Sequence, residues 1–327
     1  MKHRGFRFAY AVKIFLMAAA LAAIGCAAGC SSQFAAPFDF NNFYFDYSMV
    51  SNSDGQYIVI TELLVSQTDI TIPDTIYDIP VRGIGESAFA DNPDITSVTF
   101  GSNITSIGAN SFGGCTALES ITFSVSASDI QIGEYAFTNC TALQSVEIPD
   151  NVTSVGRGAF YDCKALKDVT ISKNLTDIGG RAFAGTKWLK AQTKEKDFVT
   201  AGDGILIAYG GSKTDVTLPK KVKQISGAFA GNTKIENVKL TSKVTNIGDM
   251  AFMGCESLET VTIPKSVESV GNGAFYGCKN LKWVILKDNV TSIGEDAFAY
   301  CGAAIYVNEG SAAQQYCIDH DLVYNIM

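Results

Sequence analysis

Apolar residues recur along the chain with a fixed period. A Phe that follows Ala or Ser occurs at residues 89, 112, 137, 160, 183, 229, 252, 275 and 298. The copies are 23 residues apart, except for one step of 25 and one of 46. Because 46 is twice 23, one unit between Phe183 and Phe229 has lost its Phe and kept its length, so the array is expected to continue through it. Such a period is typical of a fold that stacks repeated units.

Each unit carries a strand signal followed by a turn signal. In one unit Val146 and Ile148 alternate with polar residues, which predicts a half-buried strand. Pro149 ends this strand because it has no N–H to donate. A second apolar pair precedes Gly156, where a glycine allows a turn that a side chain would obstruct. Phe160 then points inward from a tight helical or 3₁₀ turn, and stacked units about 4.8 Å apart close a core that one unit cannot.

The repeated Leu, Ile, Pro and Ala-Phe positions, with a Cys three residues after most of the Phe residues, resemble the BspA-type leucine-rich repeat, also called the Treponema pallidum type. The resemblance covers roughly residues 70–307. It implies a repeat solenoid, a right-handed leucine-rich-repeat array with a parallel β-sheet on the concave side and short helical or 3₁₀ turns. It also implies a bacterial cell-surface role, most often adhesion to host or matrix proteins or contact with other cells.

The rest of the chain is out of phase with this repeat. We expect a leader at 1–29, a tether at 30–45, a β cap at 46–70, the solenoid at 71–307 and a small α/β cap at 308–327, because an open solenoid end is an unpaired edge. A variant coil spans 186–215, where Gly202-Asp203-Gly204 between two apolar runs predicts a hairpin. This segment is interpreted as a structural variant coil, with a binding protrusion as the alternative.

The leader has a basic start, an apolar stretch from Ile14 to Ile24 and small residues before a cysteine, which predicts a secretory signal too short for a stable membrane span. Cys30 and Cys26 each end a segment that resembles the lipobox of bacterial lipoproteins, which implies a lipidated first residue of the mature chain. Cys30 is preferred because polar residues follow it. The expected location is the bacterial cell envelope, exported and lipid-anchored at the cell surface; simple cleavage to a soluble secreted protein is the alternative.

Charge and histidine content exclude several classes of function. The 327 residues carry a net charge of −8; without the leader, which has four bases and no acid, 21 basic and 33 acidic residues leave −12. A chain that acidic, with only three arginines after the leader, lacks the electrostatic footprint of a nucleic-acid binder. Only His320 remains after the leader. Most His-dependent triads and His-rich metal sites are therefore excluded, and we expect no enzyme, cofactor or metal.

Cysteines share one position of the repeat. Those at 115, 140, 163, 255, 278 and 301 all follow the repeat Phe by three residues, and Asn92, Thr186 and Asn232 occupy that place elsewhere. Equivalent positions of stacked coils form one interior column, so these cysteines are expected to be buried free thiols that act as small hydrophobes. Disulfides or metal binding are the alternatives. Asn fits the same column as a small group able to bond turn carbonyls.

Exposed strand positions form two columns on the predicted sheet. One runs Ser97, Ser120, Ser145, Asp168, Asn237, Thr260, Trp283, and the other Thr99, Thr122, Glu147, Thr170, Thr217, Lys239, Thr262, Ile285. Trp283 and Ile285 interrupt these polar columns side by side, and such an apolar spot favours partner contact. Packing against the C-terminal cap would explain it equally well. With the charged Lys239 and Glu147, these residues are the partner-binding candidates.

The function expected from the sequence is binding. A lipid-anchored, non-enzymatic envelope protein would present its repeat sheet to an extracellular protein or glycan, with the membrane reached through the lipid and no nucleic acid involved. An acidic surface favours basic or divalent-bridged partners. Two alternatives stay open: a structural envelope spacer without a specific ligand, and an accessory glycan-binding subunit.

Overall fold

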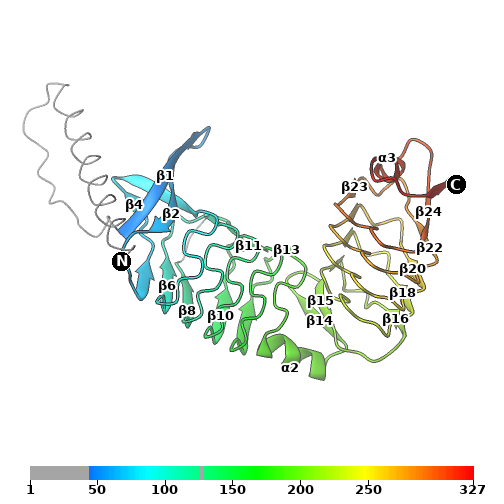
Figure 1. Cartoon of the computed structure of the whole chain (residues 1–327), viewed down its shortest axis with the longest axis horizontal. Helices are drawn as coiled ribbons and strands as arrows, with labels where there is room; N and C mark the ends of the chain where they lie inside the picture. Colours follow the sequence, from blue (N-terminus) through cyan, green and yellow to red (C-terminus); the bar gives the residue numbers. More distant parts are fainter. Residues whose placement is uncertain (1–43, 125–127) are drawn as a thin grey trace, which may run out of the picture. The chain divides into compact units, whose positions relative to one another are not determined.

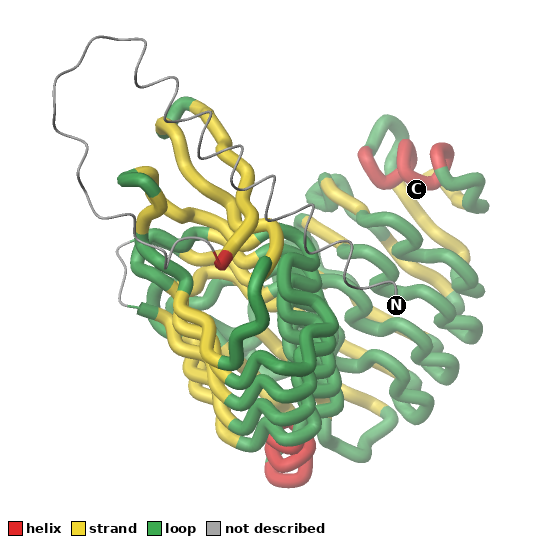
Figure 2. Tube along the Cα trace, turned by 60° about the vertical axis from the view of Figure 1, so that its left-hand side comes forward, coloured by secondary structure: helices red, strands yellow, loops and turns green. Residues whose placement is uncertain are grey.

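Stacked coils of a β-solenoid make up the described part of the chain, which a computed structural model gives as residues 44–124 and 128–327 (Figure 1). Each coil contributes two short strands, so the repeat builds two columns of parallel strands (Figure 2). The sequence indicated only the first. The second arises from apolar pairs such as Val152 and Val155, which pair with Ile130 and Ile132 of the preceding coil. The predicted leucine-rich-repeat solenoid is confirmed.

In the first array, the strands of both columns follow one another in chain order. The first column consists of β3 (Asp69–Thr71), β6 (Ser97–Phe100) and β8 (Ser120–Phe123), then β10 (Ser145–Ile148) and β12 (Asp168–Ile171) as a separate two-stranded sheet. The second column consists of β5 (Ile79–Ile84), β7 (Ser106–Ile107), β9 (Ile130–Ile132), β11 (Val152–Val155) and β13 (Asp177–Ile178). Inward residues of both columns form the core.

The repeat Phe residues stack face to face inside each array. Ring centroids of Phe137 and Phe160 are 5.3 Å apart with planes 9° from parallel, and Phe252 and Phe275 are 5.1 Å apart at 8°. Offset stacking of this kind stabilises beyond the area buried. The ladder covers Phe89 to Phe183, then Phe229 to Phe298.

The turn that carries each Phe is not a regular helix. Tyr161 N–H donates to the Gly158 carbonyl and Cys163 N–H to that of Phe160, which are the three-residue hydrogen bonds expected of a 3₁₀ turn. However, Gly158 and Asp162 have φ of +60° and +56°. These left-handed residues, placed two before and two after Phe160, turn alternate N–H groups toward the next coil, which a helix cannot do.

Gly156 lies at a point where two coils come close together. A Cβ built on it would lie 2.5 Å from the backbone N of Glu134 in the preceding coil. The sequence analysis attributed this glycine to the conformation of its own turn. The structure shows that the neighbouring coil is what leaves no room for a side chain. Gly133 and Gly179 occupy the same place in adjacent coils, with similarly short contacts.

Between Phe183 and Phe229 one coil differs from the rest, in the segment where the sequence predicts a variant coil. Helix α2 (Lys187–Glu195) and the antiparallel pair β14 (Phe198–Ala201) and β15 (Ile205–Tyr209) replace one coil, and neither strand column pairs across the interruption. Thr186 occupies the Cys position, and its hydroxyl oxygen accepts the Leu189 N–H, an N-cap that starts a helix where other coils form the turn before the strand. The hairpin predicted at Gly202-Asp203-Gly204 is confirmed.

The second array repeats the design of the first. One sheet runs β16 (Asp215–Thr217), β18 (Asn237–Lys239), β20 (Thr260–Thr262), β22 (Trp283–Ile285), β24 (Ala304–Val307), β25 (Tyr324–Ile326). The other runs from β14 and β15 through β17 (Gln224–Ile225), β19 (Asn246–Ile247), β21 (Ser269–Val270) and β23 (Ser292–Ile293).

Both ends of the described chain carry elements outside the repeat. Strands β1 (Phe45–Asn52) and β2 (Gly55–Leu63) are antiparallel, β2 lies parallel to β5, and β4 (Thr75–Ile76) pairs antiparallel with β5. At the other end, the ring of Tyr316 in α3 (Ala312–Asp319) makes an edge contact with Phe298 at 6.3 Å. No helix in 44–124 or 128–327 has both the length and the apolar character to cross a membrane.

Candidate partner-binding surface

The sheet β16–β18–β20–β22–β24 presents two rows of outward side chains. Its register places Asp215, Asn237, Thr260, Trp283 and Ala304 in one row, and Thr217, Lys239, Thr262, Ile285 and Tyr306 in the other. Between them Val216, Val238, Val261, Val284 and Ile305 are buried in the core. The strict alternation of a half-buried strand therefore fixes which side chains reach solvent.

The C-terminal part of this face is apolar. Trp283 lies opposite Ala304 and Ile285 opposite Tyr306, and we call these four residues the Trp283 surface. The side chain of Trp283 is 38% exposed. Helix α3, the cap element that could have covered it, instead packs Tyr316 against Phe298 at the end of the Phe ladder. Trp283 is therefore partly exposed on this face, and packing against the cap stays the alternative to partner contact.

The other part of the face is polar, and its residues bond to one another. The Asn237 amide donates to the Asp215 carboxylate at 2.7 Å, and the Thr260 hydroxyl donates to the Asn237 side-chain oxygen at 2.5 Å. Lys239 is exposed in the second row and forms no ion pair or side-chain hydrogen bond with any residue of the described ranges. Its ammonium is available to a partner that also covers Trp283.

Lysines beside this face are paired with acids. Lys282 lies 2.6 Å from Glu259, and Lys279 lies 2.7 Å from Glu256, each joining adjacent coils. The hydrogen bond from Lys279 lowers the pKa of Glu256 below its usual value and raises that of Lys279. Both pairs are solvent-exposed, so they contribute little to stability.

Glu147 does not join the other candidates. It lies in β10 opposite Thr170 of β12, in the two-stranded sheet of the first array. The structure thus brings Trp283, Ile285 and Lys239 to one sheet and places Glu147 on another. The lipidation candidates Cys30 and Cys26 lie outside the described residues.

The cysteine column is buried except at Cys301, which is partly exposed, and the five buried thiols have hydrogen-bond acceptors. Sγ of Cys115 lies 3.1 Å from the carbonyl oxygen of Phe89, and Sγ of Cys255 lies 3.0 Å from that of Phe229. Burial raises the pKa of Cys115 to about 11 and that of Cys255 to about 12. Within the described ranges, no group of three or more His, Cys, Asp or Glu residues is arranged to hold a metal ion.

Asparagine at the cysteine position behaves differently from the expectation. The Asn232 side-chain oxygen accepts the backbone N–H groups of Lys234 and Ile235, at 2.9 and 3.2 Å. Asn92 likewise accepts the N–H of Asp94. The side-chain oxygens of these residues accept backbone N–H groups two or three residues later in the sequence, which closes local turns. Their side chains do not bond turn carbonyls.

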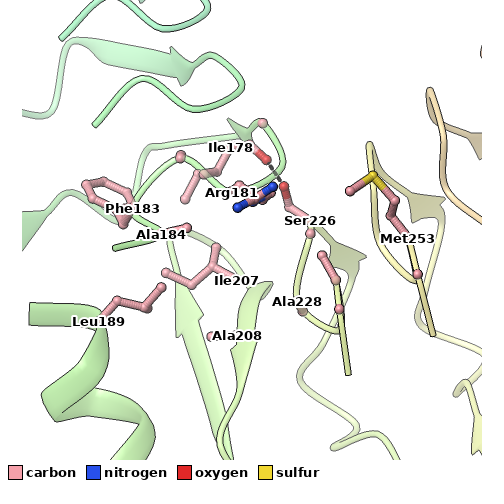
Figure 3. Close-up of a pocket in the computed structure, with 16 residues that line it drawn as sticks. Ile178, Arg181, Phe183, Ala184, Leu189, Ile207, Ala208, Ser226, Ala228 and Met253 are labelled. Carbon is pink, nitrogen blue, oxygen red and sulfur yellow. Dashed lines mark hydrogen bonds between the residues drawn. The ribbon is translucent and has the colours of Figure 1, made fainter. Parts of the chain in front are cut away.

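Sequence patterns gave no sign of two further features. All three arginines after the leader stack on a tyrosine: Arg82 on Tyr57 of β2, and Arg157 and Arg181 on Tyr135 and Tyr161 of the preceding coil. In addition, a cavity of about 350 Å³ opens where the two arrays meet, lined in part by Phe183, Leu189 and Ala228 (Figure 3). The interruption itself creates the cavity, so no residue motif marks it.

Comparison with known proteins agrees with this architecture. Residues 82–204 and 208–315 match the BspA type leucine rich repeat region, with six copies. No curated protein matches the chain.

Several solved structures are similar to the chain. The T. pallidum leucine-rich repeat protein is 22% identical over 73% of this chain and 88% of its own, with a TM-score of 0.41. The pneumococcal vaccine antigen PcpA is 18% identical over 87% and 97%, with a TM-score of 0.41. A leucine-rich cell surface protein of Faecalibacterium prausnitzii is 24% identical over 83% and 95%, with a TM-score of 0.34.

Proposed function

The chain belongs to the BspA-type leucine-rich repeat family, and from this premise we propose that it is a bacterial cell-envelope lipoprotein that binds an extracellular protein or glycan through the Trp283 surface and Lys239. The role is adhesion or contact with other cells or a host. Binding, not catalysis, is the proposed activity, in keeping with the repeat family.

The observation that carries this proposal is the exposure of Trp283 on a rigid sheet. Each strand of that sheet is held by a parallel partner on both sides, from β18 to β24, so the outward side chains keep fixed spacings. Tryptophan is enriched among the few residues that supply most of the energy of an interface. A partner that covers Trp283, Ile285 and Tyr306 would also reach Lys239, two coils away in the same row as Ile285.

Anchoring is proposed at Cys30, with Cys26 as the alternative. A processed bacterial lipoprotein carries more than one acyl chain, which is enough for stable attachment to a membrane. Intact-mass measurement of the protein purified from membranes, followed by mass spectrometry of its N-terminal peptide, identifies the modified residue. A Cys30→Ser variant that stays membrane-bound would transfer the assignment to Cys26.

Binding is tested with the full-length chain in detergent against an array of matrix proteins and glycans. The test variant carries Trp283→Ala and Ile285→Ser. The matched control carries Ser120→Ala and Thr122→Ser, at the corresponding outward positions of β8 in the first array. A partner retained by the control and lost by the test variant supports the proposal, whereas equal binding by both variants would overturn the site.

The same array separates the alternatives. No bound partner at all would favour the envelope spacer, and hits confined to glycans would favour an accessory glycan-binding subunit. Because the protein after the leader carries a net charge of −12, binding to a basic partner should weaken as salt rises, since screening acts on exposed charges. An affinity that is independent of salt would remove the electrostatic part of the proposal.

A further inference from the structure

Lysines gather in one turn of the second array. In four successive coils this turn joins the two strand columns, as between β16 and β17, and a buried Val closes it. The N–H of Val222 donates to the Pro219 carbonyl at 3.0 Å, and that of Val267 to the Pro264 carbonyl at 3.2 Å. Within the three residues before this Val, each of the four coils carries at least one lysine. We call these residues the lysine stripe: Lys220, Lys221, Lys243, Lys265 and Lys287.

The four turns stack along the array. Strands β16, β18, β20 and β22, which lead into them, are successive neighbours in one sheet (Figure 1). Backbone bonds also join the turns: the Thr245 N–H donates to the Lys223 carbonyl at 2.9 Å, and the Glu268 N–H to the Thr245 carbonyl at 2.8 Å. Neighbouring strands are about 4.8 Å apart, so the lysine stripe runs along the array axis for about 15 Å.

No ion pair neutralises the lysine stripe. Its members are exposed, apart from the half-buried Lys287, and none of them pairs with an acid in the described part of the chain. Lysines elsewhere on this array do pair, as Lys279 does with Glu256 at 2.7 Å. The four turns themselves contain only two acids, Glu268 and Asp288. Like charges held close together repel, and a bound polyanion would remove that repulsion.

The sign of the charge at this turn differs between the two arrays. Residues 44–210 hold 10 basic and 20 acidic residues, a net charge of −10, whereas residues 211–307 hold 11 basic and 9 acidic residues, a net charge of +2. The lysine stripe is therefore a basic surface on an acidic chain. In the first array the same turn carries three aspartates and one lysine, namely Asp74, Asp129, Asp150 and Lys173.

We propose that the lysine stripe binds an acidic polysaccharide, carboxylated or sulfated, that lies along the axis of the second array. A linear polymer with anions on successive sugar units reaches one lysine turn after another. Lysine carries its charge on a flexible stem and adapts to anions whose exact positions vary along such a polymer. This site is separate from the Trp283 surface and does not depend on the function proposed above.

Two other anionic partners fit the lysine stripe less well. Single-stranded nucleic acids stack their bases on aromatic side chains, and the four turns contain no aromatic residue. Peripheral binding to a membrane adds apolar side chains that enter the lipid. The Leu, Ile and Val residues of these turns are all buried, as Leu240 and Val244 show. A row of charges without exposed apolar neighbours matches a hydrophilic, linear polyanion.

The probe is a set of heparin oligosaccharides of increasing length, with neutral dextran oligosaccharides of the same lengths as uncharged controls. Isothermal titration calorimetry with the full-length chain in detergent at pH 7 gives the Kd. Affinity for heparin should rise steeply up to the tetrasaccharide and little beyond it, because the lysine stripe ends after about 15 Å. Dextran should not bind.

The test variant combines Lys221→Gln, Lys243→Gln and Lys265→Gln. It should bind the heparin tetrasaccharide about tenfold more weakly or worse. The slope of log Kd against log salt should fall by about 2, because each ionic contact contributes somewhat less than one to that slope. A loss of affinity without a change of slope would overturn the proposal.

The matched control removes the same number of charges from exposed lysines that lie outside the stripe and have no acid partner in the described part of the chain. It should bind heparin as the wild type does. An equal loss in this control would mean that net charge alone governs binding, which would overturn the site. The control combines Lys164→Gln, Lys167→Gln and Lys190→Gln.

Further measurements separate this site from the other surfaces and partners. The variant with Trp283→Ala and Ile285→Ser should keep its affinity for heparin, and a loss there would move the site to the Trp283 surface. Absence of heparin binding by the wild type would overturn the proposal. Tighter, stripe-dependent binding to a single-stranded DNA oligonucleotide, or to mixed micelles that contain an anionic lipid, would overturn the choice of a polysaccharide.

Discussion

The Cys140 thiol lies 3.2 Å from the carbonyl oxygen of Phe112, one coil earlier. The same pair recurs at Cys163 with Phe137 and at Cys278 with Phe252. Asn92 and Asn232 take the cysteine place in the two coils that follow no repeat Phe. Asparagine therefore occupies this position where no repeat Phe precedes it, and cysteine occupies it in the other coils except at Thr186, whose hydroxyl donates to the Phe183 carbonyl.

Replacing a cysteine of this position by asparagine should lower the stability of the chain. Cys140→Asn places an amide beside Phe112 in a fully buried site, and an unsatisfied buried polar group costs about 1–3 kcal/mol. Cys140→Ala loses only the weak thiol bond and a small volume. Guanidinium unfolding monitored by circular dichroism should therefore give Cys140→Asn the lower midpoint. Equal midpoints for the two variants would contradict the rule.

Buried thiols should make stability fall at alkaline pH. Burial raises the pKa of Cys255 from 9 in the unfolded chain to about 12, so the unfolded state loses a proton first as pH rises above 9. The stability that the buried thiol contributes is therefore fully present below pH 9. Above pH 9 the free energy of unfolding falls toward pH 12, by about 1.4 kcal/mol per thiol at about pH 10.

The comparison with Cys255→Ala isolates this thiol from other alkaline groups. The difference in unfolding free energy between wild type and variant should shrink as pH rises above 9. A difference that stays constant across this range would mean that Cys255 ionises alike in both states.

Two glycines should show two different costs when changed to alanine. Gly156→Ala would press a Cβ into the backbone of Glu134, so two coils must separate, and such overpacking costs about 1–3 kcal/mol or more. Gly231 has φ of +73° with open space around its Cβ position, so Gly231→Ala costs only the left-handed strain of about 1 kcal/mol. Chemical unfolding should rank Gly156→Ala as the less stable variant; the reverse order would place the constraint in the turn alone.

A residue with a side chain in the left-handed conformation offers a stabilising change. Met250, two residues before Phe252, has φ of +54°. Met250→Gly should relieve about 1 kcal/mol of strain and raise the thermal midpoint. Met253→Gly, three residues later at ordinary φ, serves as the control and should lower the midpoint, because glycine gains freedom in the unfolded chain. A lower midpoint for Met250→Gly would mean that its side-chain contacts outweigh the strain.

The period of the repeat was enough to predict the solenoid. Each apolar position meets its own copy in the next coil, so the burial of Val146, Phe160 and Cys163 follows from one unit seen many times over. The second strand column escaped prediction because pairs such as Ser106–Ile107 are too short to show alternation. Parallel pairing with the neighbouring coils makes strands of them.

The interruption and the binding candidates were harder to predict. The helix that begins at Lys187 depends on a single N-cap residue, Thr186. In the sequence Thr186 stands at the cysteine position of the repeat, so it was interpreted as a substitute for cysteine and not as the start of a helix. The exposure of Trp283 depends on the elements packed around β22, and residues distant in sequence decide which those are. The repeat alignment placed Glu147 and Lys239 in one column of exposed residues. In the structure they lie on separate sheets, one in each array.

The two arrays should unfold separately when the strand that joins them is weakened. Along β15, Ile205 and Ile207 belong to the core of the first array, while Leu206 belongs to that of the second. Stacked repeats are coupled only through such nearest-neighbour contacts. Leu206→Ala should cost about 2–5 kcal/mol and split one unfolding transition into two. Leu258→Ala, buried within the second array, should destabilise that array without loosening the joint.

Two tryptophans report on the two arrays. Trp188 packs on Phe183 at the end of the first, and Trp283 lies in the second. In a Trp283→Phe background, fluorescence follows the first array, and in a Trp188→Phe background it follows the second. The two denaturation curves should coincide for the otherwise wild-type chain and separate once Leu206→Ala is added, since the joint then no longer transmits folding. Coincident curves with Leu206→Ala would show that contacts such as that between Ser226 and Ile178 couple the arrays instead.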